Sequence, residues 1–492
     1  MNNLHQILLQ PTDVLFFRDG RPMSGSLAGH SAAWPLPDIP NHALHAALHR
    51  AELVGTHRHR QGRSGEYLDQ RDRQFGSLLT AGPFPVRIAE PAAASKPPRN
   101  AIHTWYFPRP KDSQLANSVA VTHLPVSSLP GMDRDAAWQS SSLPRPLRYG
   151  VANTQPPTKS TGAEAWISTA AFEAYLREQS GPEPHFFLRD TDLADTEHRI
   201  GIGIDPASGT TGRGAAEGQI YSAHYLRLRE ECRMGLFAQA IDKSNGSQDQ
   251  PRDLIQELLN GSPRQIVVGG QQRICTASRT DVTDPLPLPK GMRSEFNTAH
   301  SADSKCWLVK WILLTPAIWP EIVGATSRSG ETIHPHPGGW LPNWIFVDWD
   351  TEARQSRPNE RNGQVLLKLR SGRRHRDYTG TRIRRVAERE APLSARLVAA
   401  IVPKPLPVTG WALPNAANCF EGGAKSTHLA VPAGAVFYFE ADTEADADNL
   451  AAALNWHGSD TSFTTLCNRR STLMGEKGFG LGVCGTWKFL GT

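Results

Sequence analysis

Short apolar runs separated by long stretches rich in proline and glycine are the dominant pattern along this chain. Apolar runs of four to ten residues bounded by such stretches are typical of β-strands. The predicted strands are residues 4–9, 14–17, 265–269, 306–314, 364–369 and 435–440. Long loops are predicted at 90–100, 108–147, 205–218, 241–253, 281–303 and 350–364, where many of the 38 prolines and 42 glycines lie.

Helical periodicity is less common. Apolar residues recur at i, i+3, i+4 and i+7 from Leu44 to Ala51, and Pro40 suits a first helical turn, so residues 41–53 are predicted to be helical. Two further helices are predicted at 169–179, before Gly181-Pro182, and at 447–455. Short strands, few helices and long insertions without an internal repeat predict an α+β fold.

Composition narrows the class of protein. A chain of 492 residues predicts two or three domains, and a net charge of +5 with a pI near 8.9 permits an acidic partner without requiring one. The six cysteines form no C-x-x-C pair, so neither zinc-ribbon nor thioredoxin-like spacing is present. We expect no metal and no cofactor. The N-terminus lacks a secretory signal, and no apolar run approaches the roughly 20 residues of a spanning helix, so we expect a cytoplasmic protein without membrane contact.

A glycine-rich stretch lies near the C-terminus, at residues 474–487. Five glycines between Gly475 and Gly485 allow close backbone approach, and Lys477 adds a cation. The stretch predicts either a phosphate cradle or a tight hairpin packed on the last strand. Its G-x-G-x-x-G spelling does not indicate a dinucleotide site, because only seven residues follow Gly485 and no βαβ unit fits. No Walker A loop occurs in the chain.

An arginine-flanked turn follows the second predicted strand. Arg18-Asp19-Gly20-Arg21-Pro22 predicts a sharp turn in which Gly20 suits a positive φ. The two arginines suit bidentate recognition of a phosphate or a base. The alternative is an Asp–Arg pair that merely fixes the turn.

Two other clusters carry charge or titratable groups. His42, His45 and His49 share one face of the first predicted helix, opposite its apolar stripe, which indicates a solvated or RNA-facing surface and no metal site. The segment 368–389 is strongly basic, which suits either an acidic partner or a solvated loop. Its cations are Lys368, Arg370, Arg373, Arg374, Arg376, Arg382, Arg384, Arg385 and Arg389.

In combination, these segments resemble a known family. Leu15-Phe-Phe-Arg-Asp-Gly-Arg-Pro22 is similar to the opening signature of the third Cmr subunit, a RAMP-superfamily member of the type III-B CRISPR effector complex. Further similar segments follow in the same order: Trp34–Pro37, Glu197–Asp205, Glu217–Tyr221, Val268–Arg273, Leu313–Trp319, Pro432–Gly434 and the glycine-rich loop.

Three departures from the family pattern stand out. Asn41 replaces a glycine at the helix start, with an arginine only later, at Arg50; Gln271 replaces a glutamate after Gly269-Gly270; and the middle of the chain holds additional Pro-rich and Arg-rich insertions. The first departure weakens the transfer of any helix-borne RNA contact. The last indicates that the 368–389 block belongs to a subset of relatives.

The resemblance implies two ferredoxin-like (RRM-related) modules with long loop insertions, which we place at 1–230 and 231–492. It implies a non-catalytic scaffold that grips the 5′ handle of the CRISPR RNA. The partners implied are the large polymerase-like subunit and the backbone RAMP subunit. A sheet surface with glycine loops and arginines suits single-stranded RNA.

The expected RNA contacts combine side-chain phosphate clamps with close backbone approach at the glycines, and Phe479 is expected either to stack on a base or to pack under its loop. The predicted RNA-binding residues are Arg18, Asp19, Gly20, Arg21, His45, Arg50, Arg273, Lys477, Gly478, Phe479, Gly480 and Gly482. Two alternatives stay open. One is a metal-independent endoribonuclease with His42, His45 or His49 as general base. The other is an interaction protein that binds no nucleic acid.

Overall fold

The computed structural model describes most of the chain outside the longest insertions. The described residues are 4–17, 28–29, 34–53, 78–89, 102–116, 119–126, 147–153, 164–179, 187–205, 207–212, 220–242, 252–280, 285–301, 304–326, 332–367, 393–412 and 423–491. Strands outnumber helices among them, which is consistent with the predicted α+β class. No described helix is long and apolar enough to span a membrane.

The N-terminal module is built on an eight-stranded antiparallel sheet in the order β10-β9-β4-β3-β13-β1-β17-β16. Its strands are β1 (His5–Pro11), β3 (Leu79–Ala89), β4 (Ile102–Pro108), β9 (Glu164–Ser168), β10 (Phe187–Arg189), β13 (Cys232–Gln239), β16 (Arg264–Val267) and β17 (Ile274–Thr280). The first strand, β1, lies in the middle, between β13 and β17.

One face of this sheet is covered by two helices, α1 (Asp38–Arg50) and α5 (Leu254–Leu258). Side chains alternate along β1, so Ile7 and Leu9 pack against the apolar stripe of α1, which includes Leu44 and Leu48. Leu8 points the other way, into a second core.

The C-terminal module has a five-stranded sheet. The path β18-β19-β29-β24 is extended by β30, which pairs with β19. Their bounds are β18 (Thr298–Ser301), β19 (Ser304–Leu313), β24 (Ala395–Ile401), β29 (Val436–Ala441) and β30 (Gly482–Thr486). Helix α7 (Glu444–Leu454) covers one face; Thr443 caps its N-terminus by accepting a hydrogen bond from the Asp446 amide.

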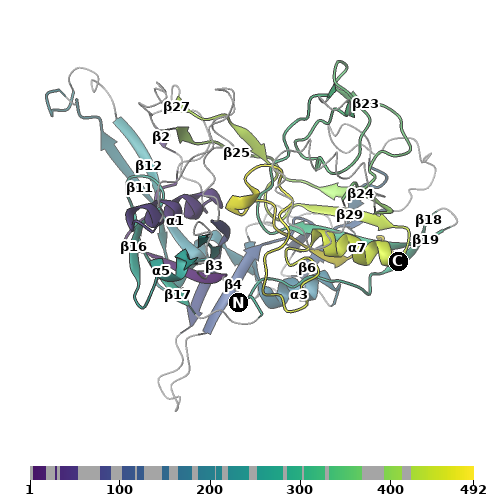
Figure 1. The fold of residues 1–492 in the computed structure, drawn as a ribbon, viewed down its shortest axis with the longest axis horizontal. Helices are drawn as coiled ribbons and strands as arrows, with labels where there is room; N and C mark the ends of the chain where they lie inside the picture. The colour runs from purple at the N-terminus through teal and green to yellow at the C-terminus, as the bar shows by residue number, and fades with distance from the viewer. Residues whose placement is uncertain are drawn as a thin grey trace, which may run out of the picture.

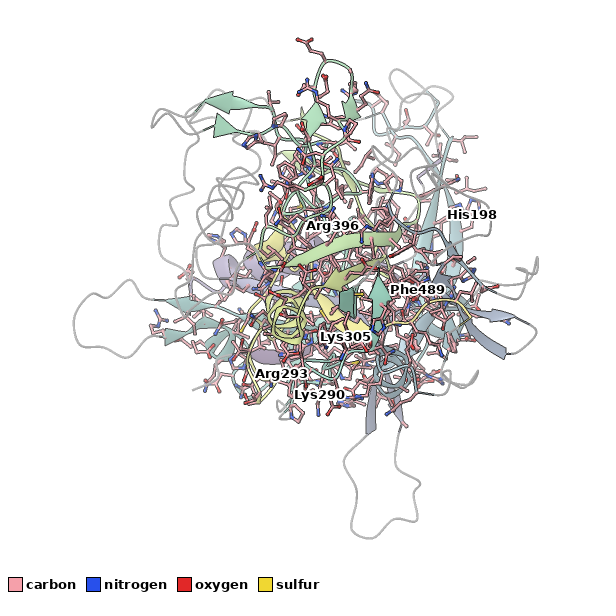
Figure 2. All side chains as sticks on the ribbon, turned by 90° about the vertical axis from the view of Figure 1, so that its right-hand side faces the viewer. His198, Lys290, Arg293, Lys305, Arg396 and Phe489 are labelled. Atoms are coloured by element: carbon pink, nitrogen blue, oxygen red, sulfur yellow. The ribbon has the colours of Figure 1, made fainter. Side chains whose placement is uncertain are left out.

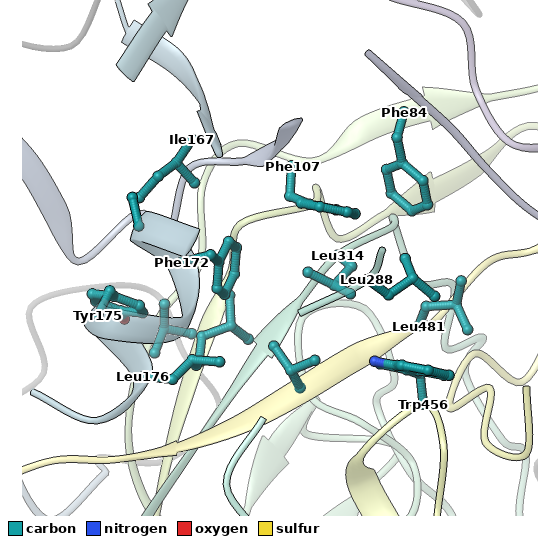
Figure 3. Close-up of a cluster of buried hydrophobic side chains, with 14 of the residues drawn as sticks. Phe84, Phe107, Ile167, Phe172, Tyr175, Leu176, Leu288, Leu314, Trp456 and Leu481 are labelled. Carbon is teal, nitrogen blue, oxygen red and sulfur yellow. The ribbon is translucent and has the colours of Figure 1, made fainter. Parts of the chain in front are cut away.

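The two sheets face each other across a shared core. Phe84 and Phe107 of the N-terminal sheet lie near Leu314, Leu481 and Trp456 of the C-terminal module (Figure 3). Helix α3 (Thr169–Leu176) adds Phe172 and Leu176 to the same cluster. In Figure 1, the purple and blue N-terminal elements accordingly lie beside the green and yellow C-terminal ones. Each sheet therefore has one face under helices or long loops and the other against its neighbour.

This packing closes the central part of the two large sheets to ligands. Both faces of the central strands β1 and β29 are buried in apolar clusters. The surfaces that remain open to a partner are sheet edges, hairpins and loops.

A buried polar group also joins the modules. Lys310 interrupts the apolar run of β19, and its Nζ lies 4.0 Å from Oδ2 of Asp112. The hydroxyls of Tyr175 and Tyr438 donate to the same carboxylate at 2.6 and 3.0 Å. Burial lowers the pKa of Lys310, which the negative charge of Asp112 opposes. The lysine is tolerated inside the core because an anion compensates its charge.

Several smaller sheets and turns lie outside the two large sheets. A three-stranded sheet has the order β11-β12-β2, with β2 (Ala28–Gly29), β11 (Ala194–Ile202) and β12 (Ile220–Leu228), and helix α4 (Asp190–Leu193) precedes it. The β11–β12 hairpin projects from the N-terminal module at the left of Figure 1. Two-stranded pieces pair β5 (Ser113–Ala116) with β6 (Val119–Thr122), β7 (Leu124–Pro125) with β8 (Val151–Ala152), β14 (Ile241–Asp242) with β15 (Arg252–Asp253), β20 (Ala325–Thr326) with β21 (Thr332–Ile333), β22 (Trp349–Asp350) with β23 (Gln355–Ser356), β25 (Leu406–Val408) with β28 (His428–Ala430), and β26 (Trp411–Ala412) with β27 (Gly423–Ala424). A 3₁₀ turn, η5 (Gly475–Lys477), precedes β30.

The sequence prediction was right for most of its elements and wrong for the module boundary. Four predicted strands correspond to β1, β16, β19 and β29, and the three predicted helices to α1, α3 and α7. Residues 14–17 and 364–367 form isolated bridges instead of strands. The boundary after residue 230 is wrong, because β13, β16 and β17 belong to the N-terminal sheet; the chain passes to the second sheet between β17 and β18.

Candidate functional site

Three arginines surround one tyrosine at the base of the β11–β12 hairpin. The guanidinium carbons of Arg199 and Arg273 lie 5.0 and 4.9 Å from the centre of the Tyr225 ring, and Arg227 lies on the same hairpin. We call Arg199, Tyr225, Arg227 and Arg273 the arginine–tyrosine platform. The Tyr225 ring is itself buried against Phe16, with 5.4 Å between ring centres. The aromatic ring thus holds guanidinium groups in place by cation–π attraction.

Two carboxylates compensate part of this charge. Glu197 lies 2.5 Å from Arg199 and 2.7 Å from Arg227, and Asp13 lies 2.9 Å from Arg227. Hydrogen bonds from Arg227 and Arg199 lower the pKa of the Glu197 carboxyl. The pKa of Asp13 is lowered overall: slight burial raises it, but the hydrogen bond and the positive charge of Arg227 help to outweigh that effect.

The platform keeps one net positive charge, from three arginines against two carboxylates. Arg199 and Arg227 are 41% and 45% exposed, so an incoming anion can reach them. Exposed ion pairs of this kind contribute about 1 kcal/mol or less, so phosphate oxygens can replace the carboxylates at low cost. Chemically, the site suits a phosphodiester chain with an unpaired base.

A tight turn ties the platform to the first segment of the chain. The turn Gly270–Arg273 joins β16 to β17, and Gln271 Oε1 accepts a hydrogen bond of 2.6 Å from the Tyr225 hydroxyl. The Gly270 amide donates to the Phe16 carbonyl at 2.8 Å, and a Cβ at Gly269 would lie 2.7 Å from the same oxygen. The platform therefore adjoins residues 15–17, which begin the Arg18–Arg21 motif; Arg18, Asp19, Gly20 and Arg21 themselves lie outside the described residues.

The opposite face of the hairpin is apolar. Ile200, Ile202, Ile204 and Ile220 are 57–68% exposed. Ile202 stands opposite Ile220 and Ile200 opposite Ser222, and His198 and His224 stack edge to face below them. Figure 2 shows His198 on this hairpin, at the margin of the molecule. An exposed cluster of this kind indicates an interaction surface.

The glycine-rich loop packs tightly against protein. A Cβ at Gly478 would lie 2.9 Å from the Thr80 carbonyl oxygen, at Gly480 2.0 Å from the Ser471 amide, and at Gly482 2.3 Å from Nε1 of Trp311. Phe479 is completely buried among Ile318, Val408 and Ala430. Of the two expected roles of Phe479, packing under the loop is correct, because no face of the ring is open to a base. The close backbone approach expected at these glycines is made to the protein's own chain.

Lys477 stands at the junction of the two modules. Its Nζ donates to Nε2 of His42 on α1 at 3.0 Å. Burial raises the pKa of nearby Asp38, against the opposing charge of Lys477. The structure thus brings together Lys477 and the helix that carries the three predicted histidines.

The remaining predicted residues are distributed along α1 and beyond. His45 is half-buried with its ring 4.7 Å from that of His49, and Arg50 is exposed in the last turn of α1. The basic block 368–389 lies outside the described residues. Within the described part of the chain, no group of three or more His, Cys, Asp or Glu is placed to hold a metal ion.

Comparison with known proteins decides the family. The family model described as "CRISPR-associated protein (Cas_Cmr3)" matches residues 7–487. The chain belongs to the Cas_Cmr3 family. The expected resemblance to the third Cmr subunit is thereby confirmed. A comparison with curated proteins gave no match.

Two solved structures are similar to this Cas_Cmr3 protein at a low level. One is a chain of the type III-B Cmr-beta complex bound to cognate target RNA and AMPPnP, in state 1, with 14% identity and a TM-score of 0.36. The other is from the same complex bound to cognate target RNA, with 14% identity and a TM-score of 0.35. Each alignment covers 88% of this chain and 86% of the other. The family assignment rests on the family match and not on these scores.

Sequence reasoning missed most of the platform in this Cas_Cmr3 protein. Only Arg273 was predicted; Arg199, Tyr225 and Arg227 were not. A signal was present in the alternation of 194–202 and 220–228, which places charged residues on one face of a hairpin and isoleucines on the other. Reading that signal requires the pairing register of the two strands.

Proposed function

We propose that this protein is a non-catalytic, RNA-binding scaffold subunit of a type III-B CRISPR effector complex. It grips the 5′ handle of the CRISPR RNA and contacts the large polymerase-like subunit and the backbone RAMP subunit. Membership of the Cas_Cmr3 family supports the complex. The observation that carries the RNA role is the Arg199–Tyr225–Arg273 stack beside residues 15–17.

The chemistry of the platform favours single-stranded RNA over a protein ligand. Guanidinium groups bind phosphate oxygens in pairs and also stack on bases. Here the arginines are held by Tyr225 and by replaceable carboxylates, so little side-chain order is lost on binding. Arg18, Arg21 and Lys477 remain predicted phosphate contacts.

The two modules are each inferred to be ferredoxin-like units. Numbered along the chain, the central strands β1, β3, β13 and β17 lie in the order 4-1-3-2, and so do β19, β24, β29 and β30. The helices α1 and α5, and α7 in the second module, follow the strands that such a unit requires. This arrangement supports a RAMP scaffold whose insertions carry the contacts.

The isoleucine face of the hairpin is proposed to lie against a neighbouring protein subunit. Its side chains are aliphatic, and the neighbouring hairpin positions on that face are histidine and serine, without Lys or Arg to meet phosphates. Burying four isoleucines suits a protein interface better than an RNA backbone.

A second candidate function, the metal-independent endoribonuclease, has one observation in its favour. His42 and Lys477 are adjacent, as a base and a cation in such a site would be. However, an ammonium group only donates, so the Nε2 lone pair of His42 is already occupied. We therefore propose a scaffold and not a nuclease.

Photo-crosslinking tests this proposal. The assembled complex is prepared with CRISPR RNA that carries a photoreactive base either in the handle or in the guide, and crosslinked peptides are identified by mass spectrometry. We expect handle crosslinks to peptides of β11, β12 or the β16–β17 turn. Handle crosslinks that map only to other subunits would overturn the proposed RNA role.

A further inference from the structure

The turn between β16 and β17 has an unfavourable backbone conformation. Gln271 and Gln272 have φ values of +54° and +51°. Residues other than glycine and asparagine rarely adopt this left-handed backbone conformation. The Val268 amide donates to the Arg273 carbonyl at 2.8 Å and closes the turn. Asn-Gly would adopt this primed turn with less strain, so two consecutive glutamines indicate that their side chains are needed.

The orientation of the Gln271 amide follows from its partners. Arg273 Nη2 lies 3.3 Å from Oε1 of Gln271, and a guanidinium group only donates hydrogen bonds. The oxygen of Gln271 therefore faces the platform, where the Tyr225 hydroxyl also donates to it. Its NH₂ group is left as a donor, and Gln272 is exposed next to it.

The turn is also firmly placed. Its glycines, Gly269 and Gly270, fit against Phe16 with no room for a side chain, and the Gly270 amide is bonded to the Phe16 carbonyl. The backbone of both glutamines is thus held in place beside arginines that suit phosphates, and the Gln271 side chain is fixed by Tyr225 and Arg273. A glutamine amide, which both donates and accepts, matches N6 and N7 of adenine, the bidentate pairing that glutamine characteristically makes with a base edge.

We propose that Gln272, oriented by the turn and assisted by the NH₂ group of Gln271, reads the edge of an unpaired adenine in the RNA held by the arginine–tyrosine platform. This specificity role rests on the proposed RNA function. The platform supplies affinity through phosphates, and the glutamine turn supplies the preference for a base.

The test uses Gln272→Gly in the full chain. Glycine relieves the positive φ, so the variant should fold and melt about 1–3 °C higher than the parent protein. Affinity is measured for oligo(A), oligo(C) and oligo(U) of equal length. We expect the parent protein to prefer oligo(A) by about fivefold or more, the low end for a bidentate amide–adenine pair, and Gln272→Gly to lose that preference.

Glu295→Gly is the matched control, because Glu295 is another exposed residue with a positive φ, of +62°. It should keep the preference for oligo(A). A Gln272→Gly variant that melts higher and retains the preference would overturn the inference. The double variant Arg199→Gln/Arg273→Gln distinguishes failure of this inference from failure of the proposed function. If Gln272→Gly keeps the preference but the double variant weakens binding to all three RNAs, the platform binds RNA and the glutamine turn does not select the base. If the double variant changes nothing, both proposals fail.

Discussion

Nζ of Lys477 lies 3.0 Å from Nε2 of His42, although 435 residues separate the two in the chain. The contact lies where the glycine-rich loop meets helix α1 and strand β3. The contact makes the loop a junction between the modules. Its glycines are therefore needed because the loop packs closely against the rest of the protein. This junction and the arginine–tyrosine platform lead to separable expectations.

Gly480→Ala should destabilise the fold. Gly480 has a φ of +78°, and a Cβ there would meet the backbone of Ser471, so the loop must shift. We expect a loss of about 3 kcal/mol or more in the free energy of unfolding, measured by denaturant titration. Gly491→Ala is the control, because Gly491 has a φ of +90° but open space around it, and should cost about 1 kcal/mol. Equal losses would contradict a packing role for Gly480.

The protein should bind repeat-containing RNA without cutting it. Purified protein is incubated with the RNA in the absence of metal, and the products are separated by gel electrophoresis. Because His42 Nε2 accepts a hydrogen bond from Lys477, it is not available to take a proton from a 2′-OH. Single-site cleavage that disappears in His42→Ala would establish the nuclease instead.

Glu197→Gln should raise the affinity for RNA. The substitution removes a carboxylate that neutralises Arg199 and Arg227 and leaves both guanidinium groups in place. We expect binding several times tighter at moderate salt, with a steeper salt dependence, measured by fluorescence anisotropy. Glu257→Gln, which removes the partner of Arg252 away from the platform, is the control. Unchanged affinity in Glu197→Gln would mean that the ion pairs serve only to fix the hairpin.

The double variant Ile200→Ser/Ile202→Ser should impair assembly of the complex. Each isoleucine buried at an interface contributes about 1–2 kcal/mol, so we expect a decrease of tenfold or more in affinity for the partner subunit. Co-purification and light scattering measure the assembly. Leu429→Ser replaces an apolar side chain that is similarly exposed elsewhere and should assemble normally. Normal assembly of the isoleucine variant would remove this face from the interface.

The predictable part of the fold is the part with local signals. Helix α7 follows from its apolar spacing, and β19 from an apolar run that only Lys310 interrupts. Asp112, the partner of Lys310, lies in the other module, so the residues near Lys310 in sequence do not predict this ion pair. The boundary after residue 230 failed for the same reason: the pairing of β13 with β1 is a long-range property.

The candidate site shows the same limit. Tyr225 and Arg273 are ordinary residues in their own segments and become a site only when the hairpin and the turn meet. Phe479 illustrates the converse, because its glycine-rich context left stacking on a base and packing under the loop both open, and tertiary packing buried the ring completely. The family motif pointed to residues 15–17, which lie against the platform through Phe16, whereas the spacing of the glycines did not point to this region.

The salt dependence of handle binding tests the central claim most directly. Binding of the CRISPR RNA handle is measured between about 50 and 200 mM salt for the parent protein, Arg199→Gln/Arg273→Gln and the control Arg357→Gln, which breaks an exposed pair with Asp350. If both platform arginines contact phosphates, the double variant should bind more weakly, with a slope of log K against log salt shallower by about 1.4, and the control should match the parent. A double variant with the affinity and slope of Arg357→Gln would contradict the account.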